Sequence, residues 1–133
     1  MVLEKKQIKL ERSAHTLIET NPPIIKIEVG ENEFIEVAEV EKIHQANLEL
    51  SNSRPFCVLL DTSKGHFNVS PAANKLLASA EYGNTRMAAA IIVKTLATKL
   101  AGNFFITFNK PSTPTRLFTN EEDALEWLRK FGK

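Results

Sequence analysis

The sequence is poor in cysteine and glycine. Its single cysteine, Cys57, excludes an internal disulfide, and its place in the apolar run 56–60 indicates a small buried side chain rather than a reactive thiol. The five glycines stand far apart, at positions 30, 65, 83, 102 and 132, so they form neither a phosphate-binding loop nor a dinucleotide fingerprint. These shortages argue against a disulfide scaffold and against nucleotide hydrolysis.

The chain also lacks an excess of charge and a long hydrophobic segment. Lysine and arginine number 17 against 16 aspartates and glutamates, and a net charge of +1 gives no general attraction to nucleic acid or to an anionic membrane. Residues 1–10 alternate charged and apolar side chains, unlike a signal peptide, and no segment approaches the roughly 20 apolar residues that span a bilayer. We therefore expect a cytoplasmic protein that binds no nucleic acid and does not insert stably into a membrane.

Catalytic and metal-binding motifs are missing as well. The three histidines, His15, His44 and His66, lie in different predicted elements, without a cysteine or carboxylate at the spacing of a known metal site. No Gly-x-Ser-x-Gly sequence is present, and an unrecognised enzyme would need His66, Asp61 and a serine to converge. We expect no metal, no cofactor and no catalytic residue, so the sequence points to binding rather than to catalysis.

What the sequence does contain is an ordinary globular composition. Hydrophobic residues make up 43% of the chain and charged residues 25%, which is enough apolar surface for a packed core. A chain of 133 residues fits one hydrophobic core, so we expect one domain over residues 1–133. No repeat, linker or low-complexity segment divides it.

Hydrophobic periodicity predicts strands first, and then helices and strands in alternation. Apolar alternation at 8–18 and 25–29 predicts strands that open the chain as an antiparallel group. The elements expected after them are helices over 37–50, 71–83, 96–108 and 121–131, and strands over 56–60, 87–93 and 115–118. This order predicts an α/β fold whose mixed sheet has N-terminal antiparallel strands, a parallel part and about four helices that cover at least one face.

The loop at residues 61–70 is the best candidate for a functional site. Loops at the carboxyl ends of parallel strands carry the sites of open α/β sheets, and the amino end of a helix favours anions. The candidate residues for a protein partner or an anionic group are Asp61, Ser63, Lys64, His66, Asn68 and Ser70. A structural role explains the same pattern and is favoured: Asp61 and Ser63 shape the turn, and Ser70 caps the helix.

The predicted helix at 96–108 is more apolar than one buried stripe requires. Large apolar side chains recur at every fourth position, at Leu96, Leu100, Phe104 and Phe108, and Phe105 stands next to Phe104. We expect these residues chiefly to fill the core. The alternatives are that they line an apolar pocket or form a contact between two copies of the chain, as a homodimer.

Four stretches carry a family resemblance. They are Leu59-Leu60-Asp61 with Ser70 downstream, residues 86–90, residues 101–110, and residues 114–119 running into Glu122, Ala124, Trp127 and Leu128. Together with the order of elements, they resemble the STAS domain of the anti-sigma factor antagonists. The closer resemblance is to the small bacterial proteins called SpoIIAA-like or STAS/SEC14-like, and it covers nearly all of the chain beyond Pro23.

The resemblance implies two functions. In anti-sigma factor antagonists, a partner kinase phosphorylates a serine at this helix start, and the added charge breaks the partner contact. By position this serine is Ser70, although Pro71 and Ala72 follow it where the family has Ser or Thr and then Gly. The resemblance thus implies a non-enzymatic signalling or protein-interaction module that uses residues 61–70. Its SEC14-like side implies instead a binder of a small apolar or lipid-like ligand, held between the sheet and the helix at 96–108.

Overall fold

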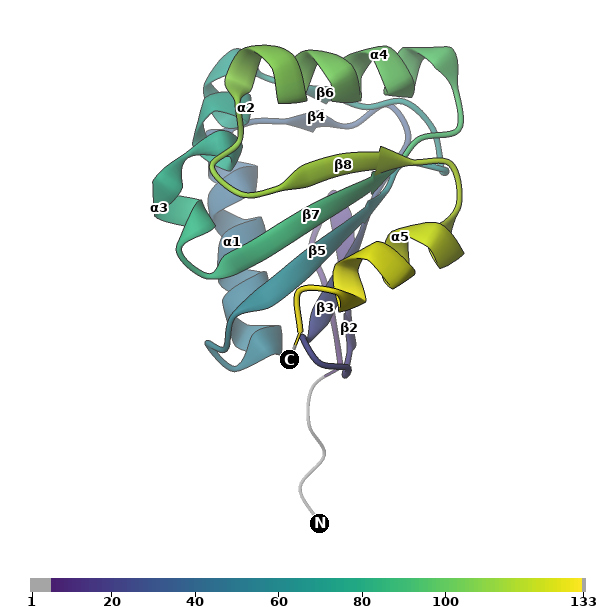
Figure 1. Cartoon of the computed structure of the whole chain (residues 1–133). Coiled ribbons are helices and arrows are strands. Elements are labelled where there is room, and N and C mark those ends of the chain that lie inside the picture. The colour runs from purple at the N-terminus through teal and green to yellow at the C-terminus, as the bar shows by residue number, and fades with distance from the viewer. Residues whose placement is uncertain (1–5, 133) are drawn as a thin grey trace.

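A six-stranded mixed sheet forms the centre of residues 6–132, the part of the chain that the computed structural model describes (Figure 1). The sequence prediction that residues 1–10 do not form a signal peptide falls partly on residues 1–5, which lie outside the described residues. In order across the sheet, the strands are β1 (Gln7–Lys9), β2 (Ser13–Ile18), β3 (Ile24–Val29), β5 (Phe56–Asp61), β7 (Arg86–Ile92) and β8 (Thr115–Phe118). The first three pair antiparallel, and β3, β5, β7 and β8 pair parallel, which confirms the predicted mixed sheet.

Helices cover both faces of this sheet. α1 (Val37–Ser51) and α2 (Pro71–Ala78) lie on one face, and α5 (Glu121–Arg129) lies on the other (Figure 1). α4 (Leu96–Phe104) contacts the edge strand β8 and continues into the π-helical segment η1 (Phe105–Asn109). With the short α3 (Ala80–Gly83), residues 6–132 contain five α-helices, where the sequence predicts about four.

The central strand β5 packs into two separate cores. Phe56 and Val58 face α1 and α2, whereas Cys57 and Leu59 face α5. Side chains alternate along a strand, so a strand covered on both faces needs apolar residues at every position. Cys57 is fully buried, as the sequence predicts, and this burial raises the pKa of its thiol to about 11.

Two local features differ from the predicted elements. Ser79 has an extended backbone, with φ −69° and ψ 154°, so the helix predicted over 71–83 is broken into α2 and α3. Apolar spacing continues across the break and hides it from the sequence. In addition, β4 (Phe34–Ile35) and β6 (Asn68–Val69) pair as a small parallel sheet, although the sequence predicts a loop at 62–69.

A buried polar network ties β2 to α1. His15 is fully buried, with its Nδ1 3.1 Å from Oδ1 of Asn47 and its Nε2 2.8 Å from Oγ of Ser13. A neutral imidazole satisfies both contacts, because it donates from Nδ1 to the amide oxygen and accepts the serine proton at Nε2. Burial lowers the pKa of His15, and the hydrogen bond to Asn47 opposes this shift only in part.

This network predicts a pH dependence of stability. Below pH of about 6.5, the unfolded chain protonates His15 whereas the folded chain keeps it neutral, so the free energy of unfolding should fall as the pH drops. We expect His15→Gln to remove this contribution and the exposed His66→Gln to retain it. Urea unfolding between about pH 7.5 and pH 5.5 measures both slopes. Equal slopes for wild type and His15→Gln would contradict a neutral buried imidazole.

The two helices α5 and α4 give a matched test of burial. Leu128 on α5 is 0% exposed, whereas Leu100 on α4 is 59% exposed. Leu128→Ala should lower the free energy of unfolding by about 2–5 kcal/mol, because it leaves a cavity in the core. Leu100→Ala should change it by less than about 0.5 kcal/mol. Urea unfolding followed by circular dichroism measures the two values, and equal losses would show that the placement of these helices is wrong.

Candidate functional site

The candidate loop at 61–70 is divided between the two sides of the sheet. Asp61, at the end of β5, faces α5, where Nζ of Lys26 lies 3.8 Å from its Oδ2 and 2.7 Å from Oε1 of Glu121. His66 and Asn68 lie on the opposite side, where they line a cavity. The structure therefore does not gather the loop's candidate residues into one site.

Asp61 holds the start of the loop in place. Its Oδ1 accepts a hydrogen bond of 2.9 Å from the backbone amide of Ser63. Burial alone would raise the pKa of Asp61, but the hydrogen bonds from Ser63 and the charges of Lys26 and Lys94 outweigh it, so its pKa lies below the usual value. The carboxylate is thus ionised at neutral pH and serves the turn.

The remaining loop residues also make local contacts. Oγ of Ser70 accepts a hydrogen bond of 3.1 Å from the amide of Ala73 and so caps α2. Nζ of Lys64 lies 3.9 Å from Oε2 of Glu28, and Nε2 of His66 lies 3.3 Å from Oδ1 of Asn68. A phosphosite at Ser70 stays a prediction.

Catalytic and metal-binding arrangements are not found in residues 6–132. No hydrogen bond in this part of the chain joins His66 to Asp61, Ser63 or Ser70. The same residues include no group of three His, Cys, Asp or Glu side chains that could hold a metal ion. Nor does any helix within them have the length and apolar character needed to cross a membrane.

The helix α4 presents its most apolar side to solvent, contrary to the expectation that these residues fill the core. The exposed fractions are 72% for Leu96, 59% for Leu100, 55% for Phe104 and 69% for Phe108, and we call these four residues the apolar stripe. The rings of Phe104 and Phe108 stack with their centroids 4.5 Å apart. The sequence is thus right that the residues share one side and wrong about what covers it.

Small residues explain why the other side of α4 packs inward. Thr98 and Gly102, one turn apart, are the buried residues of this helix. A Cβ atom at Gly102 would lie only 2.7 Å from Cδ2 of Leu117 on β8, so the helix approaches the strand where a side chain is missing. This pair of small residues is the signal in the sequence that could have identified the inward side.

The apolar stripe lies in a part of the chain without acidic residues. Residues 82–120 contain neither Asp nor Glu. They do contain exposed cations on and beside α4 and η1, namely Lys94, Lys99, Lys110 and Arg116. The stripe is therefore accompanied by positive charge, even though the net charge of the whole chain is only +1.

A cavity of about 320 Å³ lies beneath α4, and we call it the α4 cavity. Its walls come from β3, β5 and β7 of the sheet, from α1 and α2, and from the inward side of α4. Of the five residues predicted to line an apolar pocket, Phe104 and Phe105 contribute to it. Leu96 and Leu100 on α4 and Phe108 on η1 do not line this cavity, because their side chains are exposed to solvent.

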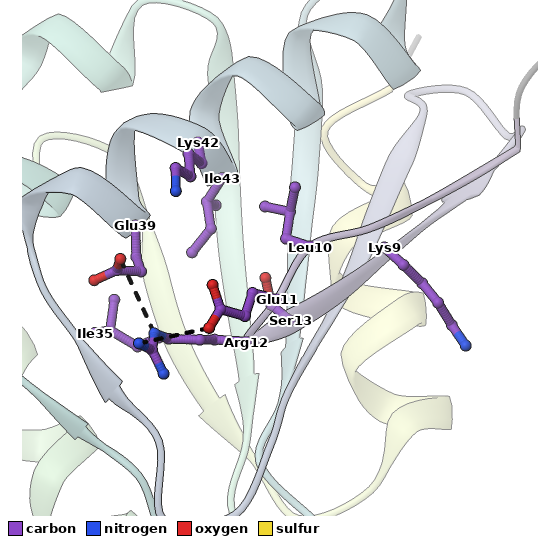
Figure 2. A pocket seen from close by; sticks show the side chains of 9 residues that line it. All are labelled: Lys9, Leu10, Glu11, Arg12, Ser13, Ile35, Glu39, Lys42 and Ile43. Atoms are coloured by element: carbon purple, nitrogen blue, oxygen red, sulfur yellow. Dashed lines mark ion pairs between the residues drawn. The ribbon is translucent and has the colours of Figure 1, made fainter.

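A second hollow, of about 280 Å³, lies between α1 and the turn that joins β1 to β2. Figure 2 shows Arg12 at its base, with the carboxylates of Glu11 and Glu39 directed toward the guanidinium. The shortest of the contacts to Arg12 is a hydrogen bond of 2.9 Å that its Nη1 donates to Oε1 of Glu33. The guanidinium of Arg12 is therefore already paired with the protein's own carboxylates, which leaves little of its charge for a ligand.

Comparison with known proteins identifies the family. The chain belongs to the family described as domain of unknown function DUF7793, whose model matches residues 17–132. No curated protein matches the chain.

A solved structure gives the fold. The chain is similar to an uncharacterised DUF3478-family protein with a SpoIIAA-like fold from Shewanella loihica PV-4, with a TM-score of 0.62 and 18% identity over 91% of this chain and 97% of that one. The anti-sigma factor antagonist SpoIIAA in its unphosphorylated form also matches, with a TM-score of 0.49 and 12% identity over 86% of this chain and 97% of that one. Because the Shewanella loihica protein has a SpoIIAA-like fold, the fold of this DUF7793 member is SpoIIAA-like, as the sequence resemblance predicts.

The capping role of Ser70 can be tested by stability. Ser70→Ala should lower the free energy of unfolding by about 1 kcal/mol, because the amide of Ala73 loses its acceptor. Ser70→Asp should retain most of the stability, since aspartate is an equally good N-cap. Urea unfolding measures both variants. If Ser70→Asp is as unstable as Ser70→Ala, the capping role is wrong.

Proposed function

We propose that the protein is a non-enzymatic signalling or interaction module that binds another protein through the apolar stripe. The observation that carries the proposal is the exposure of four large apolar side chains, between 55% and 72%, on one side of α4 and η1. Contiguous exposed apolar surface is uncommon on proteins that act alone and marks sites of interaction. A partner that covers the stripe would remove this surface from water, which favours binding.

The charge around the stripe indicates what kind of partner fits. Exposed cations accompany the stripe, and residues 82–120 supply no acidic side chain to balance them. At the Leu96 end of the stripe, Asp123 of α5 lines the same hollow as Lys94 and Lys99, so the partner's acidic groups would face mainly the cations farther along. A complementary partner presents an apolar surface rimmed by Asp and Glu, because matched charges steer association and oppose wrong partners. The occupant of the stripe is therefore an acidic-rimmed protein surface.

The sequence resemblance supports a protein partner rather than a membrane. Anti-sigma factor antagonists, which the chain resembles, act by binding proteins. α2, which begins after Ser70, contacts η1, and η1 carries Phe108 of the apolar stripe. A bacterial, cytoplasmic setting is part of the same proposal, and the resemblance supports it.

Variants of the apolar stripe test this function. We expect the double variant Leu100→Ser, Phe108→Ser to bind the partner at least about tenfold more weakly, because two large apolar contacts are lost. Affinity capture with the wild-type chain provides the partner, and calorimetry with the purified partner measures the affinity. Phe34→Ser is the matched control, since Phe34 is 49% exposed but lies on β4.

Two further measurements address the other occupants of the stripe. Sedimentation velocity would reveal a wild-type dimer that the double variant dissolves, and co-sedimentation with phosphatidylserine vesicles would reveal stripe-dependent membrane binding. Either result, without a stripe-dependent protein partner, would overturn the proposal. Equal affinity of the double variant and Phe34→Ser for the captured partner would do the same.

A further inference from the structure

Arg86 brings a positive charge to the wall of the α4 cavity. It lies at the start of β7, where Phe56 pairs with Arg86 but Cys57 pairs with Ala88. Met87 is therefore an extra residue in the ladder, a β-bulge that changes which face the preceding side chain occupies. As a result Arg86 shares the cavity face with Ala89 and Ile91, instead of facing α5 with Ala88.

The guanidinium of Arg86 is held by neutral groups. Nη2 donates a hydrogen bond of 2.8 Å to the carbonyl oxygen of Leu77, and Nε donates one of 3.2 Å to Oγ1 of Thr113. Nη1 makes no hydrogen bond within residues 6–132, and none of the ion pairs in that range involves Arg86. This differs from Arg12, whose charge is met by Glu11, Glu33 and Glu39.

The surroundings of Arg86 make an anionic partner favourable. Among the described residues that line the α4 cavity, Arg86 is the only Lys, Arg, Asp or Glu. Burial lowers the pKa of Arg86, because its charge is removed from water without a carboxylate to compensate. A cation in this position gains most from an anion that enters the cavity, since the interaction is weakly screened there.

The rest of the wall defines the other part of the ligand. Most of it is apolar, with Ile27 and Val29 from β3, Val58 and Leu60 from β5, and Phe105 from η1. A volume of about 320 Å³ corresponds to about ten water molecules at about 30 Å³ each. The space suits an apolar group of similar size, about ten non-hydrogen atoms.

The geometry points to the α4 cavity as a binding site for a small apolar molecule that carries one carboxylate, with Nη1 of Arg86 contacting the carboxylate and the apolar part lying beneath α4. Nε and Nη2 already donate hydrogen bonds within the protein, so the carboxylate would be held by a contact from Nη1 rather than by a bidentate pair. This site goes beyond the proposed function, because it lies on the inward side of α4. Of the apolar stripe, Phe104 also lines the cavity, whereas Leu96, Leu100 and Phe108 do not.

Ligands of one chain length test the site. NMR titration of the isotope-labelled chain with octanoate, 1-octanol and octylammonium compares three head groups on the same apolar tail. We expect octanoate to bind at least about tenfold more tightly than 1-octanol, and octylammonium more weakly than both, because of the charge of Arg86. Resonances of residues beneath α4, such as Ala89 and Ile91, should shift.

Variants of the cavity wall separate the contribution of the ligand's charged head from that of its apolar tail. Arg86→Met should remove the preference for octanoate while leaving the affinity for 1-octanol unchanged, and Arg86→Lys should retain part of the preference. Ala89→Leu should weaken both ligands, because it fills the cavity. Retained binding of 1-octanol shows that Arg86→Met is folded, and the three-ligand comparison in wild type holds even if a variant does not fold.

Three results would overturn the inference: no binding of octanoate to wild type, equal binding of octanoate and 1-octanol, or unchanged octanoate affinity in folded Arg86→Met. The stripe variant Leu100→Ser, Phe108→Ser should bind octanoate as wild type does. This variant distinguishes the two proposals. If the stripe does not bind a protein, octanoate binding to the cavity is unaffected, and if octanoate does not bind, the test of the stripe is unaffected.

Discussion

A Cβ atom at Gly102 would lie 2.7 Å from Leu117, so α4 approaches the edge strand β8 at a point where the helix has no side chain. This contact fixes the rotation of the helix. With Thr98 and Gly102 turned inward, the apolar stripe has to point outward. The small inward residues also fail to fill the space over β5 and β7, and the α4 cavity is what remains. Both proposed binding surfaces therefore depend on one helix–strand contact.

Charge is unevenly distributed along the chain, and its distribution says more about the two proposed binding surfaces than the net charge of +1 does. The segment 82–120 has no acidic residue, and it supplies both Arg86 in the cavity and the exposed lysines beside the stripe. Elsewhere several cations meet carboxylates, as Arg12 does with Glu33 and Lys26 with Glu121. Segment 82–120 thus places five cations on and around α4 without an acidic residue of its own, where the two proposed ligands carry negative charge.

The loop at 61–70 shows how the pleat of a strand separates neighbours in sequence. Leu60 lines the α4 cavity, whereas Asp61, the next residue, faces α5 and pairs with Lys26. Because successive side chains point to opposite faces, residues that look clustered in the sequence end on different sides of the sheet. The role of Ser70, unlike the placement of the other loop residues, could be predicted from the sequence. A serine before a proline at a helix start caps that helix regardless of how the helix packs.

The sequence by itself determined the elements whose signals are local: the helix α1, the doubly buried strand β5, the amphipathic α5, the cap at Ser70 and the burial of Cys57. Only the tertiary structure decided which side of α4 is covered, how β4 meets β6, and which face Arg86 occupies. The physical reason is that periodicity shows that a helix has an apolar side, but the neighbour that covers it comes from long-range packing. A bulge likewise appears only when two strands, 56–61 and 86–92, are placed side by side.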